Sequence, residues 1–240
     1  MQVYAHRGFS GLYPENTMLA FEKAVSCGAD GIELDVHCSK DGKLVIIHDE
    51  TLIRTTGKAG TVQDYRLDEL IKINAGKTFS NSFGDTPLPS FSEYCAYIRD
   101  KDVTTNVEIK TNLWYYNDIE EKILDTIKEF DIEDKILFSS FNWLSCARIK
   151  QLAPHIPCGI LLEDKAVKNL APLMHKMGMD YFHPDKMLLD EKTVQQCKEQ
   201  HVGLNVWTVN DRDSLQQLIA WNVEGVITNH PDFCLEYLHK

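Results

Sequence analysis

The chain has 240 residues, 43% of them hydrophobic and 25% charged, which is enough to bury a full core in a single domain spanning residues 1–240. Its formal net charge of −11 disfavours nucleic acid and anionic membrane surfaces as main partners, because both reward basic patches. There is no basic segment followed by an apolar one at the start and no apolar run near the ~20 residues of a membrane span, so we expect a cytoplasmic protein without stable membrane association that acts on a small molecule.

The first part of the chain alternates strands with helices. A short strand at 2–5 is followed by Pro14-Glu15-Asn16-Thr17, a sequence typical of a helix start. The next strand covers 31–36, and a turn then leads to the apolar run 44–47, which ends at His48. That run forms either a hairpin with the second strand or an extension of it.

The later strands each precede a helix. The expected strands cover residues 104–109, 136–139, 158–161, 181–182, 203–207 and 225–228, and the expected helices begin near Asn117, Asn142, Val167 and Pro231. Eight alternating units in 240 residues fit an α/β fold of the (β/α)8 TIM-barrel type better than a doubly wound sheet. Residues 50–89 break the rhythm with several glycines and prolines and one helical piece at 67–74, so we expect a small inserted lobe after the second strand.

Two carboxylates lie on one face of the second strand. Side chains alternate along a strand, so Glu33 and Asp35 point the same way while their apolar neighbours pack on the other face. Two carboxylates one pleat apart repel unless a cation lies between them, and oxygen ligands of this kind suit Mg²⁺ or Ca²⁺. An edge strand with its polar face in water is the alternative, but the alternating pattern predicts a parallel sheet covered by helices.

Further charged residues fall at the same rim of the predicted barrel. Active sites of this architecture lie at the carboxyl ends of the strands. His6 and Arg7 close the first strand and His48 ends the run at 44–47. Glu108 and Lys110 share one face at the end of the third strand. The rim therefore combines three carboxylates, two histidines, an arginine and a lysine.

This set of residues points to cleavage of a phosphodiester. The carboxylates would hold one hard cation, while Arg7 and Lys110 would bind the phosphate that the cation also contacts. His6 and His48 would move protons, one from the nucleophile and the other to the leaving oxygen. From the residues alone we expect a metal-assisted phosphodiester site.

Other residues near the rim have two possible readings each. Glu15 approaches the metal, orients Arg7, or simply interacts with the helix dipole. Phe141 and Trp207 end two later strands and wall a pocket or pack in the core. We expect Asp49 to orient a neighbour or cap a turn, His37 to lie past the strand end at the surface, and His183 to lie on the rim, a location that alone does not decide whether it contacts the substrate's head group.

The motifs together resemble those of the glycerophosphodiester phosphodiesterase family over nearly the whole chain. The matching stretches are Ala5-His6-Arg7-Gly8, Pro14-Glu15-Asn16-Thr17, Gly31-Ile32-Glu33-Leu34-Asp35-Val36, Val45-Ile46-Ile47-His48-Asp49, Thr51-Leu52, Arg54-Thr55-Thr56, Val107-Glu108-Ile109-Lys110, Ile227-Thr228-Asn229 and Pro231-Asp232. The resemblance implies a TIM barrel, one Mg²⁺ or Ca²⁺ on Glu33, Asp35 and Glu108, and His6 and His48 as the general acid and base. It also implies Arg7 and Lys110 on the phosphate and an aromatic such as Trp207 at the barrel mouth.

The activity that the resemblance implies is hydrolysis of glycerophosphocholine, glycerophosphoethanolamine and similar diesters to sn-glycerol 3-phosphate and an alcohol. A lysophospholipase D-like enzyme, or a relative that forms a cyclic phosphate, is the alternative within enzymes. A barrel that only binds a phosphorylated ligand is the alternative outside them. Head-group preference, the choice of ion and the formation of homo-oligomers stay open at this point.

Overall fold

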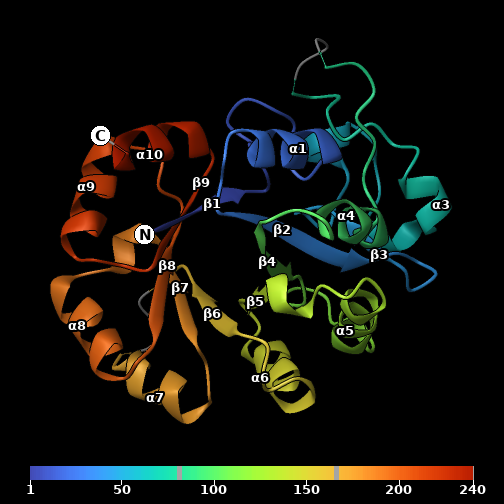
Figure 1. Ribbon diagram of the computed structural model, residues 1–240. Coiled ribbons are helices and arrows are strands. Elements are labelled where there is room, and N and C mark those ends of the chain that lie inside the picture. Colours follow the sequence, from blue (N-terminus) through green and yellow to red (C-terminus); the bar gives the residue numbers. More distant parts are fainter. Residues whose placement is uncertain (80–82, 165–167, 240) are drawn as a thin grey trace.

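The computed structural model describes residues 1–79, 83–164 and 168–239, and in them nine strands form one sheet that closes on itself (Figure 1). Eight parallel strands follow each other around the barrel, and β1 pairs with both β9 and β2 to close it. The strands are β1 (Gln2–His6), β2 (Gly31–Cys38), β3 (Leu44–Ile46), β4 (Thr104–Ile109), β5 (Ile136–Ser140), β6 (Cys158–Leu162), β7 (Tyr181–Pro184), β8 (Gly203–Val206) and β9 (Gly225–Thr228).

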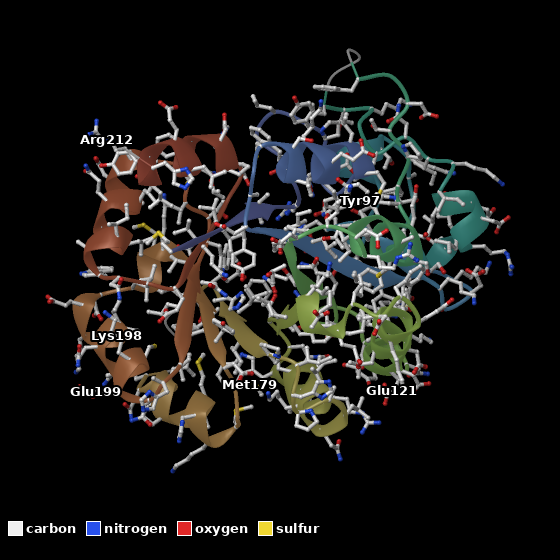
Figure 2. All side chains as sticks on the ribbon, in the orientation of Figure 1. Tyr97, Glu121, Met179, Lys198, Glu199 and Arg212 are labelled. Atoms are coloured by element: carbon white, nitrogen blue, oxygen red, sulfur yellow. The ribbon has the colours of Figure 1, made fainter. Side chains whose placement is uncertain are left out.

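The helices form a ring around the strands, apart from the two single-turn helices of the segment between β3 and residue 91 (Figure 1). The helices are α1 (Met18–Ser26), α2 (Ile53–Thr56), α3 (Leu67–Leu70), α4 (Phe91–Ile98), α5 (Ile119–Glu129), α6 (Trp143–Leu152), α7 (Leu170–Lys176), α8 (Glu191–Glu199), α9 (Arg212–Ala220) and α10 (Pro231–Leu238). Apart from α2 and α3, their apolar faces pack against the outward side chains of the strands in one large core, while charged residues such as Lys198, Glu199 and Arg212 lie on the outside (Figure 2). Within the described ranges, no helix has the length and apolar character needed to span a bilayer.

The predicted TIM barrel is confirmed, with differences at the ends of single elements. The run after the second strand forms a hairpin, because β3 pairs antiparallel with the end of β2 and extends β2 to Cys38. The helical piece expected at 67–74 is only the single turn of α3. The helix start expected near Val167 lies outside the described residues, and α7 is described from Leu170.

Tyrosine rings packed against glycines fill the barrel interior near the amino ends of the strands. A Cβ atom on Gly31 would lie 2.3 Å from Cδ1 of Tyr4, and one on Gly203 would lie 2.7 Å from Cδ1 of Tyr181. Only glycine allows these tyrosine rings to cross the interior so closely. This packed floor leaves the space at the carboxyl ends of the strands for a site.

The inserted lobe lies between β3 and α4 and has its own small core. The buried apolar residues of this lobe core are Val45, Ile47, Leu52, Val62, Leu70, Ile73, Ala75 and Leu88. Val45 belongs to β3, so the lobe core begins directly beside the barrel. The helix α2 starts only five residues after His48, which places the lobe next to the mouth of the barrel.

Candidate active site

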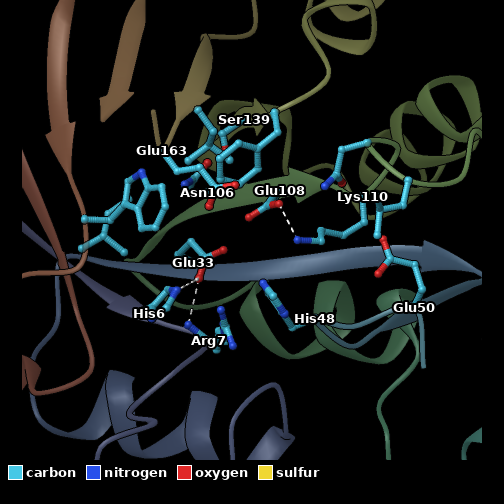
Figure 3. A pocket seen from close by; sticks show the side chains of 16 residues that line it. His6, Arg7, Glu33, His48, Glu50, Asn106, Glu108, Lys110, Ser139 and Glu163 are labelled. Carbon is cyan, nitrogen blue, oxygen red and sulfur yellow. Dashed lines mark hydrogen bonds and ion pairs between the residues drawn. The ribbon is translucent and has the colours of Figure 1, made fainter. Parts of the chain in front are cut away.

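A cavity of about 550 Å³ opens at the carboxyl ends of the strands (Figure 3). Its lining residues are His6, Arg7, Glu33, His48, Glu50, Asn106, Glu108, Lys110, Asn112, Leu113, Ser139, Phe141, Leu161, Glu163, Trp207 and Ile227. Eight of the ten residues predicted for the site are on this list. Asp35 lies buried behind the cavity wall, and Glu15 contacts Arg7 from outside the cavity.

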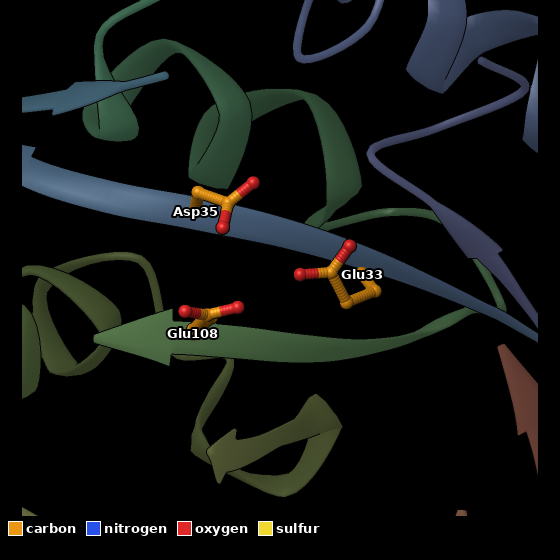
Figure 4. Close-up of side chains that lie close together, drawn as sticks. All are labelled: Glu33, Asp35 and Glu108. Carbon is orange, nitrogen blue, oxygen red and sulfur yellow. The ribbon is translucent and has the colours of Figure 1, made fainter. Parts of the chain in front are cut away.

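Three buried carboxylates meet on the inner face of β2 and β4 (Figure 4). Strand register places Asp35 opposite Glu108, and Glu33 lies two residues before Asp35 on β2. One oxygen from each of Glu33, Asp35 and Glu108 lies within 4.8 Å of the other two. The parity argument from the sequence therefore describes the real arrangement of these three side chains.

Two cationic side chains face the acidic cluster. Lys110 Nζ donates a hydrogen bond to Glu108 Oε1 at 2.7 Å and lies 3.6 Å from Asp35 Oδ1. Arg7 Nε lies 3.7 Å from Asp35 Oδ2, and the backbone N–H of Arg7 donates to Glu33 Oε2 at 2.9 Å. Lys110 therefore reaches two of the three carboxylates with its charge, and the Arg7 guanidinium reaches Asp35, which leaves part of the negative charge of the cluster uncompensated.

Burial and repulsion change the ionisation of the cluster. Burial raises the pKa of Glu33 well above its usual value, and the charges of Asp35 and Glu108 raise it further. Burial also raises the pKa of Glu108, against the opposing effect of Lys110. For Asp35 burial acts in the same direction, but the nearby His48 and Lys110 outweigh it and lower the pKa.

The cluster has the donor chemistry of a hard-cation site. Asp35 Oδ2 accepts a hydrogen bond from Asn16 Nδ2 at 2.8 Å, whereas the buried Asp35 Oδ1 has no hydrogen-bond partner within the described ranges. A divalent cation among these oxygens would remove the repulsion that raises the pKa of Glu33 and Glu108. Three carboxylates, one with a buried oxygen that accepts no hydrogen bond within the described ranges, therefore fit Mg²⁺ or Ca²⁺.

His6 is held by a neutral amide from the far end of the chain. Its Nδ1 donates to Asn229 Oδ1 at 2.6 Å, so Nε2 is the free nitrogen, 3.9 Å from Glu33 Oε2. Burial lowers the pKa of His6 to about 4, and the adjacent positive charge of Arg7 lowers it as well. The ring is therefore neutral near pH 7 and carries a lone pair on Nε2.

His48 is held by a carboxylate instead. Its Nδ1 lies 2.6 Å from Asp49 Oδ1. Burial opposes ionisation of Asp49, but hydrogen bonds from His48 and Arg54 outweigh burial and lower the pKa of Asp49. An ionised carboxylate only accepts hydrogen bonds, so Nδ1 of His48 must carry a proton. The prediction that Asp49 orients a neighbour agrees with this contact.

Glu15 orients Arg7, one of the readings offered by the sequence. Glu15 Oε1 accepts a hydrogen bond from Arg7 Nη1 at 2.9 Å. Both oxygens of Glu15 also accept hydrogen bonds from Arg54, at 2.7 and 2.8 Å. The Glu15 carboxylate therefore accepts hydrogen bonds from two arginines. It does not belong to the cluster of three carboxylates that could hold a metal ion.

Aromatic and aliphatic side chains form the opposite wall of the cavity. Phe141 and Trp207 pack edge to face with ring centroids 5.7 Å apart. Trp207 Nε1 donates to the backbone carbonyl of His183 at 2.8 Å, which fixes the indole plane. Leu161 and Ile227 complete this wall. The sequence left Phe141 between core and pocket, and the structure places it on the cavity.

Two histidines are not where the sequence predicted them. His37 was expected at the surface but is fully buried, because the hairpin with β3 extends β2 past it. Its Nε2 donates to the backbone carbonyl of His48 at 3.0 Å, and its Nδ1 accepts from Tyr116 Oη at 2.8 Å. His183 was expected on the rim but is fully buried inside the barrel, where a Cβ atom on Gly159 would lie 2.6 Å from its Cδ2.

The sequence analysis also missed neutral polar groups of the barrel interior. Asn106 and Ser139 line the cavity and are buried. Asn106 Oδ1 and Ser139 Oγ find no hydrogen-bond partner in the described part of the chain, and Asn106 Nδ2 lies 3.4 Å from Nδ1 of His183. Strand parity is the signal that would have found Asn106, because it precedes Glu108 by two residues on β4.

Comparisons with known proteins identify the family of this chain. A model of the glycerophosphoryl diester phosphodiesterase family matches residues 6–233. A glycerophosphodiester phosphodiesterase of Caldanaerobacter subterraneus subsp. tengcongensis is 40% identical over 240 residues, covering 99% of this chain and 98% of the relative. One from Bacillus altitudinis is 36% identical over 234 residues, covering 96% of this chain and 95% of the relative.

Solved structures give the same answer for the fold. An Oleispira antarctica phosphodiesterase in complex with the product sn-glycerol-3-phosphate superposes with a TM-score of 0.89 at 26% identity, covering 100% of this chain and 97% of that chain. A structure from Silicibacter pomeroyi DSS-3 has a TM-score of 0.90 at 20% identity, covering 100% and 93% of the two chains, and supports the fold alone. The chain belongs to the glycerophosphoryl diester phosphodiesterase family of enzymes.

Proposed function

We propose that the protein hydrolyses glycerophosphodiesters, such as glycerophosphocholine and glycerophosphoethanolamine, to sn-glycerol 3-phosphate and the free alcohol. One observation supports this most directly. A cluster of three buried carboxylates and two cationic side chains lies at the wall of a cavity that two imidazole rings also line. This combination suits an anionic phosphate ester whose cleavage requires two proton transfers.

Glu33, Asp35 and Glu108 would hold one divalent cation, Mg²⁺ or Ca²⁺, which when bound supplies Lewis-acid polarisation of the phosphoryl group. Arg7 and Lys110 bind phosphate oxygens, because both cations line the cavity beside the carboxylates. Trp207 and its neighbour Phe141 limit the space for the organic part of the substrate and exclude water from it.

The two histidines take different roles because their Nδ1 partners differ. His6 donates its Nδ1 proton to a neutral amide and its ring is neutral near pH 7, so its Nε2 accepts a proton from the nucleophile. His48 donates its Nδ1 proton to the ionised Asp49, which fixes the plane of the ring and places a negative charge beside it. Its Nε2 then donates a proton to the oxygen of the leaving alcohol.

One observation favours a second candidate substrate, a lysophospholipid cleaved to release its head-group alcohol. Leu113 lines the cavity while 76% of it is exposed, and the adjacent Trp114 and Tyr115 are 58% and 59% exposed. We name Leu113, Trp114 and Tyr115 the apolar mouth. An alkyl chain extending from the cavity would cover it.

The test measures product release by purified protein that has been stripped of metal with a chelator. Glycerol 3-phosphate release from glycerophosphocholine is followed after adding back Mg²⁺ or Ca²⁺, and choline release from lysophosphatidylcholine is followed in parallel. The proposal expects metal-restored release of glycerol 3-phosphate. Folded protein that releases choline only from the lysophospholipid would favour the second candidate, and no release from either substrate would contradict both.

A matched pair of variants connects the activity to the acidic cluster. Glu33→Gln removes one carboxylate of the cluster, and Glu163→Gln makes the same change elsewhere on the cavity wall. Binding of Mg²⁺ and Ca²⁺ is measured by calorimetry without substrate. The proposal expects weaker binding for Glu33→Gln alone, and equal binding by both variants would place the metal elsewhere.

A further inference from the structure

Arg54, the second residue of α2 in the inserted lobe, joins two carboxylates with four hydrogen bonds. Nε donates to Asp49 Oδ2 at 2.6 Å, and Nη2 donates to Asp49 Oδ1 at 2.9 Å. Nη1 donates to Glu15 Oε2 at 2.7 Å, and Nη2 also donates to Glu15 Oε1 at 2.8 Å. The planar guanidinium thus makes a bidentate contact with each carboxylate, a geometry that lysine does not reproduce.

Both of these carboxylates hold a residue of the proposed site. Asp49 Oδ1 is the acceptor for Nδ1 of His48 at 2.6 Å. Glu15 Oε1 is the acceptor for Nη1 of Arg7 at 2.9 Å. The same two oxygens, Asp49 Oδ1 and Glu15 Oε1, also accept from Nη2 of Arg54. Nη2 of Arg54 therefore shares one carboxylate oxygen with Nδ1 of His48 and another with Nη1 of Arg7.

The arrangement differs from an ordinary surface ion pair. A single exposed pair adds little to stability, since solvent screens it and two long side chains lose freedom. Arg54 is 44% exposed, but Glu15 and Asp49 are only 21% and 25% exposed, and bidentate contacts on both sides fix the rotation of each carboxylate. Without Arg54 each carboxylate would keep one contact to the site and would be free to turn about it.

We propose that Arg54 is a positioning residue for phosphodiester hydrolysis, which sets the orientation of His48 through Asp49 and that of Arg7 through Glu15. This inference rests on the proposed function, because it needs His48 and Arg7 to act on the substrate. It also gives the inserted lobe a role in the reaction. Arg54 itself belongs to the lobe, and its backbone carbonyl accepts a hydrogen bond from Thr78 Oγ1 at 2.7 Å farther along that segment.

The first test compares Arg54→Ala with Arg66→Ala. Arg66 is a lobe arginine that also pairs with two aspartates, Asp41 and Asp68, at 3.4 Å each, and among the described residues neither aspartate has a hydrogen bond or ion pair with a residue of the proposed site. We expect Arg54→Ala to lower kcat for glycerophosphocholine by about 10- to 100-fold with KM changed less than threefold. Arg66→Ala should keep the wild-type kcat, and thermal melting should show both variants folded at the assay temperature.

Chemical rescue separates positioning from simple lobe stability. Guanidinium at 10–50 mM should raise kcat of Arg54→Ala severalfold, whereas methylammonium chloride at the same concentration should not, because only the planar ion makes bidentate contacts. Arg54→Lys, the variant to use if Arg54→Ala does not fold, should retain an intermediate kcat. A kcat within twofold of wild type for either folded variant, or equal rescue by both salts, would overturn the inference.

A double-mutant cycle tests the route through Asp49. If Arg54 acts through this carboxylate, Arg54→Ala should cost much less in an Asp49→Asn background than in the wild type. If the double variant loses kcat by the product of the two single-variant factors, the route through Asp49 is contradicted. Wild-type protein assayed in parallel keeps the two proposals apart, since loss of the proposed function means that wild type releases no glycerol 3-phosphate, whereas failure of the inference leaves wild type active.

Discussion

The two halves of the barrel interior differ in the kind of polar group they bury. Strands β1, β2 and β4 carry ionisable groups, and each of these has an oppositely charged or hydrogen-bonding partner close by. Strands β5 to β9 carry neutral groups such as Ser139, His183 and Asn205, together with an aliphatic and aromatic wall. The difference suggests that one half performs the reaction and the other half determines the shape that the substrate must have.

The largest expected effect is in the charged half, at His48. His48→Ala should lower kcat for glycerophosphocholine by about 100-fold or more, the usual scale for general acid or base catalysis, with little change in metal binding. Steady-state kinetics and calorimetry measure the two quantities. Bis(p-nitrophenyl) phosphate sharpens the role, because its leaving group needs no proton. His48→Ala should lose less activity on that substrate than His6→Ala, and equal losses would contradict the assignment of His48 as the acid.

The next effect concerns the metal. Glu108→Gln should raise the half-saturating concentration of Mg²⁺ or Ca²⁺ by at least about 10-fold, because a ligand charge is lost while its shape is kept. Activity is titrated with metal after chelation, and Glu163→Gln serves as the cavity-wall control. An unchanged half-saturating concentration would remove Glu108 from the ligand set.

Substitutions in the neutral half of the barrel should change KM more than kcat. Trp207→Ala should raise KM for glycerophosphocholine about 10-fold with kcat reduced less, since an aromatic wall contributes roughly 1 to 1.5 kcal/mol of contact. Trp114→Ala is the matched tryptophan control, because Trp114 belongs to the apolar mouth and is outside the cavity lining. If Trp207→Ala lowers kcat alone, the division between the two halves is wrong. If Trp114→Ala raises KM for lysophosphatidylcholine only, the apolar mouth binds an alkyl chain.

The smallest effect is one of stability. Burial lowers the pKa of His183 to about 3, below the usual 6.5 of the unfolded chain. Below pH 6.5 the unfolded state binds a proton that the folded state does not, so the free energy of unfolding falls as pH falls, by about 1 kcal/mol per group between pH 7 and 5.5. His183→Gln should remove this part of the acid loss in urea titrations at the two pH values. His155→Gln, at an exposed histidine, controls for loss of a histidine. An acid loss equal to that of wild type would mean that His183 is protonated in the folded state.

The sequence predicted what depends on periodicity. Alternation along β2 and β4 was enough to bring Glu33, Asp35 and Glu108 to one face, and the barrel rule placed His6 and His48 at the same rim. The number of alternating units predicted the TIM barrel. These features follow from local patterns that repeat along a strand or between units.

The features that the sequence analysis missed depend on partners far away in the chain. His37 is buried because β3 folds back on β2, and His183 turns inward because Gly159 on the next strand leaves room for its ring. Arg54 was recognised only as part of a motif, since its contact with Glu15 spans 39 residues. Side-chain pairing across loops has no period, so a single sequence carries little signal for it.

The contact between His6 and Asn229 has a consequence for the newly made chain. These two residues are 223 positions apart, and β1 closes the barrel only by pairing with β9. A ribosome makes His6 long before it adds Asn229, whose amide holds Nδ1 of His6. We therefore expect a nascent chain to stay inactive until Asn229 and β9 have left the ribosome and β1 has paired with β9.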